Sequence, residues 1–101
     1  MQRQPLPKAL INGLVFKVEG GMYMRLSQNS GVPIYQQIAD SFKSDILAGK
    51  YAQGEYLPSI RGLARDLKIS VITTMKAYEL LEQEGLVTAE QGKGFYVNAQ
   101  D

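Results

Sequence analysis

The strongest constraint on the fold of this chain is a three-residue connection, Lys68-Ile69-Ser70, between two short amphipathic segments. In the first segment four apolar residues recur at helical spacing behind Ser59, a good helix cap: Ile60, Leu63, Ala64 and Leu67. The second segment starts from another capping serine, Ser70, and runs to about Glu84, where Gly85 stops it. Two short helices with so small a turn between them form a helix-turn-helix pattern.

A longer helix precedes this pair and a hairpin follows it. From Pro33, placed in a first helical turn, five apolar residues recur at helical spacing up to a stop at Gly49: Ile34, Ile38, Phe42, Ile46 and Leu47. Residues 86–89 and 95–97 are predicted strands, joined by a glycine-rich turn over residues 90–94. The order helix, helix, short turn, helix, hairpin predicts an α+β, mainly α, winged helix-turn-helix fold.

The chain divides near residue 31. Residues 1–30 are predicted to be an irregular N-terminal extension, with a short strand at 14–18 and a candidate second strand at 23–26, and residues 31–101 to be the winged helix-turn-helix domain. Met22 or Met24 is a candidate for the natural start, a hypothesis under which residues 1–21 would be an upstream extension. No stretch approaches the roughly 18 consecutive apolar residues of a membrane span. We therefore expect a cytoplasmic protein without membrane contact.

The composition excludes several functional classes. The 101 residues contain no His, Cys or Trp, so disulfides and the usual zinc sites and Cys or His nucleophiles are absent. No glycine-rich phosphate loop opens a helix, and no carboxylate pair is framed by other catalytic groups. We expect a protein that is not an enzyme and needs neither cofactor nor metal, with no effector pocket visible in the chain.

Four blocks of sequence resemble the GntR family of bacterial transcription regulators. They are residues 33–38 (PIYQQI), 57–64 (LPSIRGLA), 82–87 (EQEGLV) and 92–97 (GKGFYV). Residues 73–78 (TTMKAY) are most similar to the YtrA-like branch. The resemblance implies a sequence-specific DNA-binding transcription regulator, with repression as the expected outcome, that binds a double-stranded DNA operator as a homodimer. Helix 71–84 would read the major groove, and the wing around 90–94 would contact the minor groove or phosphates.

The resemblance assigns DNA contacts to three parts of the chain and to one further residue. The positions matching the family's DNA-facing residues are Tyr35, Ser59, Arg61, Ser70, Val71, Ile72, Thr73, Met75, Lys76, Gln91, Gly92 and Lys93. Structural alternatives stay open for several of them: core packing for Tyr35, a solvated helix charge or an ion pair with Asp66 for Arg61, helix capping for Ser70, partial burial for Thr73 and the hairpin turn for Gly92. For Arg65 the structural role is the better interpretation.

The recognition helix departs from the family pattern at two positions. Many relatives have arginine where this chain has Val71 and Met75, so bidentate arginine contacts to guanine are missing there. Together with Ile72, these residues could contact thymine methyl groups, which predicts A·T-rich half-site positions. Alternatively, Val71 and Met75 pack inward, or Met75 meets a partner surface.

The net charge of +1 conceals a sorting of charges. Residues 33–98 hold seven Lys/Arg and eight Asp/Glu, a net charge of −1. Arg61, Lys76 and Lys93 fall on the predicted DNA face, and Glu79, Glu82 and Glu84 gather at the end of the third helix. We expect weak non-specific DNA affinity, with tight binding dependent on dimerisation.

Two questions stay open from the sequence. The chain ends at Asp101 soon after the hairpin, so either further sequence or residues 1–30, above all the strand 14–18, would supply the dimer contact. The alternative function is a winged helix that binds a protein and not DNA, because a fold by itself does not fix a function.

Overall fold

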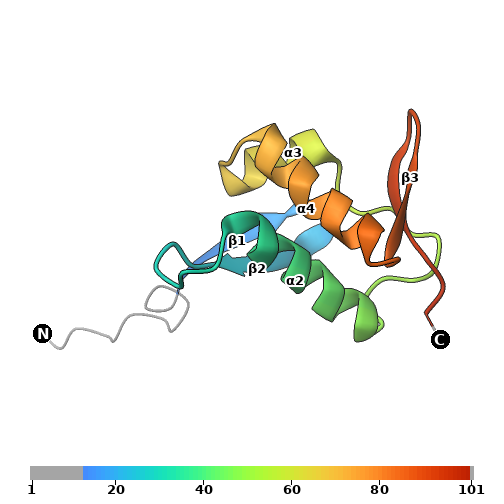
Figure 1. Cartoon of the computed structure of the whole chain (residues 1–101), viewed down its shortest axis with the longest axis horizontal. Helices are drawn as coiled ribbons and strands as arrows, with labels where there is room; N and C mark the ends of the chain where they lie inside the picture. The colour runs from blue at the N-terminus through green and yellow to red at the C-terminus, as the bar shows by residue number, and fades with distance from the viewer. Residues whose placement is uncertain (1–12, 101) are drawn as a thin grey trace, which may run out of the picture.

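The computed structural model describes residues 13–100 of the chain (Figure 1). Pro5, Pro7, the basic residues Arg3 and Lys8, and Asp101 lie outside the described residues. In chain order the elements are β1 (Leu14–Val18), η1 (Glu19–Gly21), β2 (Met22–Leu26), α2 (Ile34–Leu47), α3 (Ile60–Leu67), α4 (Val71–Gln83), β3 (Val87–Glu90) and β4 (Gly94–Val97). From residue 34 onward this is the predicted order of helix, helix, short turn, helix and hairpin.

Each helix begins where local chemistry satisfies its free N–H groups. Ser59 Oγ accepts a hydrogen bond from Gly62 N–H at 3.0 Å, and Ser70 Oγ accepts one from Thr73 N–H at 3.0 Å, as predicted for both capping serines. Pro33 lies one residue before α2 and not within its first turn. There its carbonyl accepts from the N–H groups of Gln36 and Gln37, both at 3.1 Å, so the proline still starts the helix.

The turn between α3 and α4 contains one residue, Lys68, in the left-handed helical conformation. Lys68 has φ 58° and ψ 45°, and it is the only residue other than glycine with positive φ among residues 13–100. Its N–H donates to Arg65 O at 3.2 Å, and Ile69 N–H donates to Ala64 O at 3.0 Å. These bonds satisfy the last carbonyls of α3, and the chain reverses into Ser70 without a longer loop.

The three helices and both hairpins share one hydrophobic core. Tyr78 of α4 is 1% exposed and packs edge-to-face on Phe42, at 5.6 Å between centroids, and on Phe95, at 5.2 Å. Its hydroxyl donates to Pro58 O at 2.7 Å, so the buried ring has a polar partner. The helical stripes Ile38/Phe42/Ile46 and Ala77/Tyr78/Leu81 are buried as predicted.

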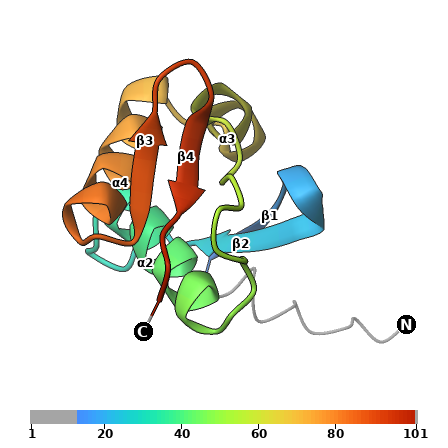
Figure 2. The same cartoon turned by 90° about the vertical axis from the view of Figure 1, so that its right-hand side faces the viewer.

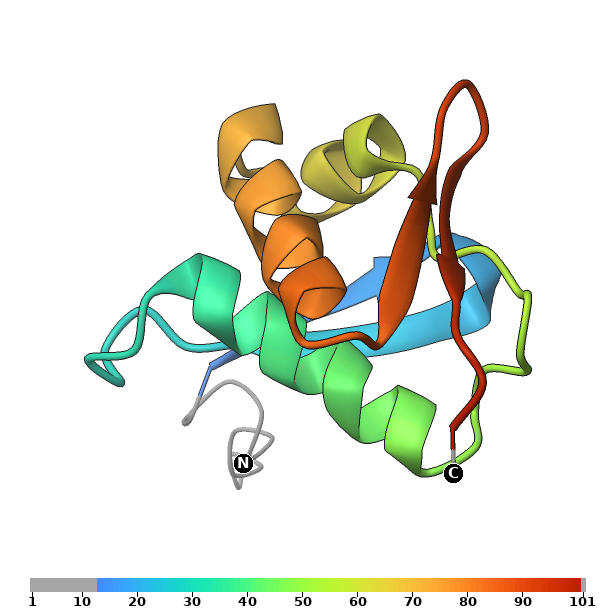
Figure 3. The same cartoon turned by 45° about the vertical axis from the view of Figure 1, so that its right-hand side comes forward.

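The N-terminal hairpin belongs to this core. β1 and β2 pair antiparallel, with Phe16 opposite Met24 and Val18 opposite Met22. Their inward side chains include Val18, Met24 and Leu26, which are 3–5% exposed, and the hairpin packs against α3 and α2. The predicted boundary near residue 31 falls in the loop between β2 and α2. The hairpin before this boundary contacts α2 and α3, and Figure 3 shows its blue strands behind the helices.

The C-terminal hairpin, β3–β4, is the wing. Its strands are shifted from the predicted ranges 86–89 and 95–97: β3 starts at Val87 because Leu86 N–H bonds to Leu81 O and closes α4. β4 starts at Gly94, so the tip is the three residues Gln91, Gly92 and Lys93. Figure 2 shows the wing in front of α3 and α4, with β1–β2 to one side, and in Figure 3 the tip of the wing projects at the upper edge.

Candidate nucleic-acid interface

The predicted DNA contacts come from three places that the fold brings to one side. The start of α4, the helix α3 and the tip of the wing all lie toward the upper edge of the molecule in Figures 1 and 3. Tyr35, near the start of α2, borders the same surface because its ring contacts Lys76 of α4. The fold therefore gathers residues spread over some 60 positions of the sequence into one surface.

The first turn of α4 presents apolar side chains to solvent. Ile72 is 81% exposed, Met75 42% and Val71 37%, whereas Thr74 between them is fully buried. The alternative that Val71 and Met75 pack inward is therefore wrong. Three apolar side chains on a helix start that stands clear of the core are available for a partner surface.

Ser70 and Thr73 form a small hydroxyl pair at the same helix start. Ser70 Oγ accepts from Thr73 N–H and donates its own proton to Thr73 Oγ1 at 2.9 Å. The capping role of Ser70 is thus confirmed, and Thr73 is half-buried, as its structural alternative predicted. Because the Ser70 proton is already used, the hydroxyl hydrogen of Thr73 is the one left to reach an external acceptor.

Lys76 and Tyr35 contact each other across α4 and α2. The Lys76 Nζ atom lies 4.1 Å from the centroid of the Tyr35 ring, a cation–π distance. Tyr35 is half-buried against the core, and Lys76 is exposed. The ring holds the ammonium group at the edge of the recognition helix, so Tyr35 has a packing role and also borders the candidate interface.

The start of α3 carries an unpaired guanidinium. Arg61 is exposed and forms no ion pair with any residue in the described range 13–100. Its predicted alternative partner, Asp66, lies 3.7 Å from Arg65, which also reaches Glu19 at 3.8 Å. The two arginines of α3 therefore differ: Arg65 is engaged within the protein, as expected, and Arg61 points to solvent.

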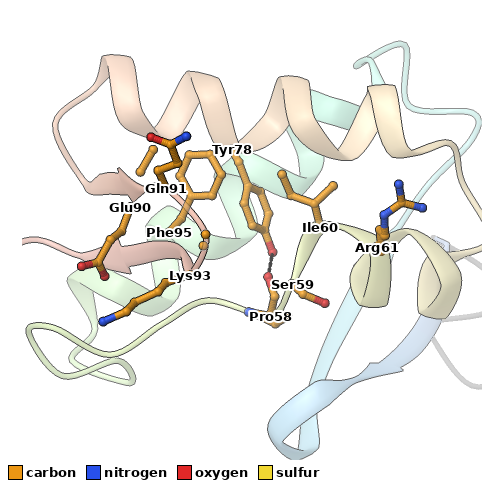
Figure 4. Close-up of a pocket in the computed structure, with 12 residues that line it drawn as sticks. Pro58, Ser59, Ile60, Arg61, Tyr78, Glu90, Gln91, Lys93 and Phe95 are labelled. Atoms are coloured by element: carbon orange, nitrogen blue, oxygen red, sulfur yellow. Dashed lines mark hydrogen bonds between the residues drawn. The ribbon is translucent and has the colours of Figure 1, made fainter.

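A groove of about 600 Å³ separates the start of α3 from the wing (Figure 4). Its sides include Ser59 and Arg61 of α3 and Gln91, Gly92 and Lys93 of the wing, and Tyr78 and Phe95 contribute aromatic surface. Figure 4 shows Arg61 and Lys93 on opposite sides of this groove. Gln91, Gly92 and Lys93 are all exposed, and Gly92 has φ 80°, so the turn itself requires this glycine.

The acidic residues of α4 and its C-terminal end lie away from these groups, whereas Glu90 lines the groove beside the wing tip. Glu84 pairs with Lys43 of α2 at 3.4 Å, and Glu79 and Glu82 are exposed further along α4. The charges of α4 are thus sorted along its length, with Lys76 toward the start and the carboxylates toward the end. Within the described part of the chain, no group of three or more carboxylates is arranged to hold a metal ion.

Sequence reasoning missed the contacts between the wing and the segment before α3. The hydroxyl of Tyr56 donates a hydrogen bond to the carboxylate of Glu90, 34 residues away in the chain. This bond to a carboxylate raises the pKa of Tyr56 above its usual value of 10.0. No local pattern signals such a pair, because it depends on how the loop before α3 lies along β4.

A helix-turn-helix followed by a two-stranded wing, on one core, defines a winged helix-turn-helix protein. Residues 34–97 match the family described as bacterial regulatory proteins, gntR family. The HTH-type transcriptional repressor YtrA of Bacillus subtilis is 36% identical over 75 residues, which are 74% of this chain and 58% of that protein. The chain belongs to the GntR family of bacterial regulatory proteins.

Solved structures show the same fold. YtrA from Sulfolobus acidocaldarius, a GntR-family transcription factor, is 35% identical with a TM-score of 0.71, over 77% of this chain and 66% of that one. The structure of AraR(DBD) in complex with operator ORX1 is 29% identical with a TM-score of 0.67, over 71% and 92% of the two chains. The chain spans less than two thirds of the length of curated relatives such as YtrA of Bacillus subtilis.

Proposed function

We propose that this chain is a sequence-specific, non-catalytic DNA-binding unit of a transcription regulator, which represses by occupying an operator. The observation that carries the proposal is the shared side on which the start of α4, the start of α3 and the wing tip present exposed, unpaired groups. The similarity to AraR(DBD), whose structure contains an operator, supports it.

None of the helices in residues 13–100 is long and apolar enough to cross a membrane. Together with the proposed DNA binding, we propose a cytoplasmic, nucleoid-associated location.

The proposed binding mode assigns a role to each part of the interface. The start of α4 enters the major groove, where Val71, Ile72 and Met75 contact base edges. Thr73 and Lys76 reach the flanking phosphates. Arg61 contacts a phosphate beside the groove, and the other predicted groups, Tyr35, Ser59, Ser70, Gln91, Gly92 and Lys93, position the helix starts or contact the backbone.

The apolar character of the α4 start gives the proposal a sequence preference. Val71, Ile72 and Met75 offer no hydrogen bonds, so they recognise a methyl group and not a guanine edge. We propose A·T-rich half-sites with thymine methyl groups opposite these three residues. Selection of binding sites from random duplexes tests this directly, and recovery of G·C-rich half-sites would overturn it.

We further propose that the operator is bound by a homodimer. A single recognition helix reads few base pairs, and two-fold symmetry doubles the information without new residues. The exposed edge strand β1, with Leu14 48% and Val15 45% exposed, is a candidate contact between copies. The spacing of selected half-sites, with the mass of the complex in solution, tests the dimer.

The decisive experiment compares the two arginines of α3 on a selected duplex. Arg61→Ala should weaken binding strongly and lower its salt dependence, whereas the matched Arg65→Ala should leave affinity near that of the unmodified protein. A gel-shift titration at two salt concentrations measures both. If the selection enriches no sequence, or if both variants bind like the unmodified protein, DNA recognition by this face is wrong and a protein-binding winged helix is favoured.

A further inference from the structure

Residues 54–57, just before α3, run alongside β4 of the wing and pair with it like a third strand. Leu57 N–H donates to Phe95 O at 2.9 Å, Val97 N–H donates to Glu55 O at 2.9 Å, and Gly54 N–H donates to Val97 O at 2.8 Å. Tyr56 forms an isolated bridge with Tyr96 in the same segment. Since the segment continues directly into Pro58 and Ser59, the wing and the start of α3 are held by one piece of backbone.

Tyr56 makes two side-chain contacts from this segment. Its ring packs edge-to-face on Tyr96, with centroids 6.0 Å apart and an interplanar angle of 73°. Its hydroxyl donates to the Glu90 carboxylate at the end of β3. The raised pKa of Tyr56 reflects the same bond, because ionisation of the phenol would remove the donor from beside the carboxylate.

Glu90 and Lys93 flank the tip of the wing without forming an ion pair. Their backbones are joined across the turn, where Lys93 N–H donates to Glu90 O at 3.0 Å. Figure 4 shows both side chains extending in the same direction from the wing. Even so, Lys93 is not within 4.0 Å of the Glu90 carboxylate or of any other acidic group in the described range.

We propose that Tyr56 is a positioning residue for DNA binding, which holds the Glu90 carboxylate so that the charge of Lys93 remains free for a phosphate. This inference rests on the proposed function. Without the Tyr56 hydroxyl, the carboxylate is free to turn toward the ammonium group three residues away. It then competes with the DNA phosphate for the ammonium group of Lys93. Tyr56 thus acts through Glu90 and Lys93 and touches no DNA itself.

The test is a double-mutant cycle in the full chain on a labelled duplex recovered by site selection. Tyr56→Phe keeps the ring and removes only the hydroxyl. It should raise Kd roughly fivefold at moderate salt and reduce the slope of log Kd against log salt by about 1, as for the loss of one phosphate contact. Glu90→Gln should bind at least as tightly as the unmodified protein, because no carboxylate remains to compete for Lys93.

The double variant separates positioning from packing. Tyr56→Phe in the Glu90→Gln background should have no effect on Kd or salt slope, because the hydroxyl then has no carboxylate to hold. Tyr96→Phe, which removes a hydroxyl from the partner ring, is the matched control and should bind normally. Urea midpoints of all variants report whether the fold is intact.

Two results overturn the inference. One is a Tyr56→Phe variant with unchanged Kd and salt slope. The other is a double variant as weak as Tyr56→Phe alone, which would assign the hydroxyl a purely structural role. Failure of the unmodified protein to bind any selected duplex is a separate outcome, because it refutes the proposed function before the cycle begins.

Discussion

The two hairpins of this protein have similar local structure but different relations to the core. Both are antiparallel pairs of short strands, and both turn over three residues with a glycine at positive φ, Gly20 at 83° and Gly92 at 80°. In β1–β2 buried residues occur at both ends, from Val18 beside the turn to Leu26 at the far end. In the wing only the root is fully buried, at Val87 and Val97, and the tip stands in solvent (Figure 2).

This difference suggests a division of roles, in which β1–β2 contributes to stability and the tip of the wing to the proposed recognition of DNA. A hairpin buried along its length contributes apolar contacts to folding, and its turn is held against α3, where Glu19 reaches Arg65. A hairpin buried only at its root leaves its tip free to meet a partner at little cost to stability. The cations follow the same division: Lys93 stands at the free tip, whereas Lys17 is on the outer face of the docked hairpin.

The largest expected effect is on the buried face of the N-terminal hairpin. Met24→Ala removes a side chain that is 3% exposed and should lower the free energy of unfolding by about 3 kcal/mol. Tyr23→Ala, on the opposite face of the same strand and 65% exposed, should cost less than about 0.5 kcal/mol. Urea unfolding measures both. Equal small losses would mean that the hairpin is not part of the cooperative core.

The sequence predicted the features that depend on local signals. The capping serines Ser59 and Ser70, the stop at Gly85 and the apolar stripes of the helices each leave a pattern within a few residues, and the structure has all of them. The exception is Leu47, the last residue of the predicted stripe of α2, which is 60% exposed. The strand at 14–18 was predicted as it stands, and the second strand one residue short of Met22. The roles of the DNA-contact residues stay predictions, whereas their gathering on one side follows from the fold.

Contacts between distant segments could not be predicted in the same way. The alternation in residues 14–26 predicts strands but does not identify α3 as their partner. At the contact itself, a Cβ atom on Gly62 would lie 2.5 Å from Glu19 Oε1, the end of a flexible side chain in the turn of the hairpin. The bond between Tyr56 and Glu90 depends on the alignment of residues 54–57 with β4, which is set by the whole core.

A second prediction uses the two turn glycines as a matched pair. Beyond the adjacent residues, no atom of the described range lies within 4 Å of where a Cβ atom would stand at Gly20 or Gly92, so alanine at either position meets only the cost of positive φ. Each substitution should lower the free energy of unfolding by about 1 kcal/mol. Only Gly92→Ala should also weaken DNA binding, because only this turn is at the proposed interface. Equal affinities of the two variants in a gel-shift titration would contradict the division of roles.

A third prediction compares one lysine from each hairpin. Lys93→Ala should reduce the slope of log Kd against log salt by about 1, since one phosphate contact is lost. Lys17→Ala removes the same charge from the docked hairpin and should leave the slope unchanged. Both variants should unfold at the same urea concentration as the unmodified protein, because both side chains are exposed. A fall in slope for Lys17→Ala would place β1–β2 against DNA as well.

The smallest expected effect concerns the loop between α2 and α3, which contacts the wing and borders a cavity at the N-terminal hairpin. Tyr51 borders a cavity shared with Glu19 and Met22 of the N-terminal hairpin, and burial, with smaller contributions from Asp45 and Glu55, raises its pKa to about 12. The unfolded chain loses this proton near pH 10.0, the folded chain only near 12. The folded state therefore holds more protons in this range, and stability must fall as the pH rises from about 10 toward 12.

Tyr51→Phe should make this decline less steep, because one group that favours the unfolded state at high pH is removed. Urea midpoints at several pH values between 9 and 11.5, a range of about two units around the tyrosine pKa, measure the slope for both proteins. Tyr56, at the wing end of the same loop, owes its raised pKa to Glu90 and not chiefly to burial. Glu90→Gln should thus leave the decline assigned to Tyr51 in place. Equal slopes for Tyr51→Phe and the unmodified protein would contradict a raised pKa of Tyr51 in the folded chain.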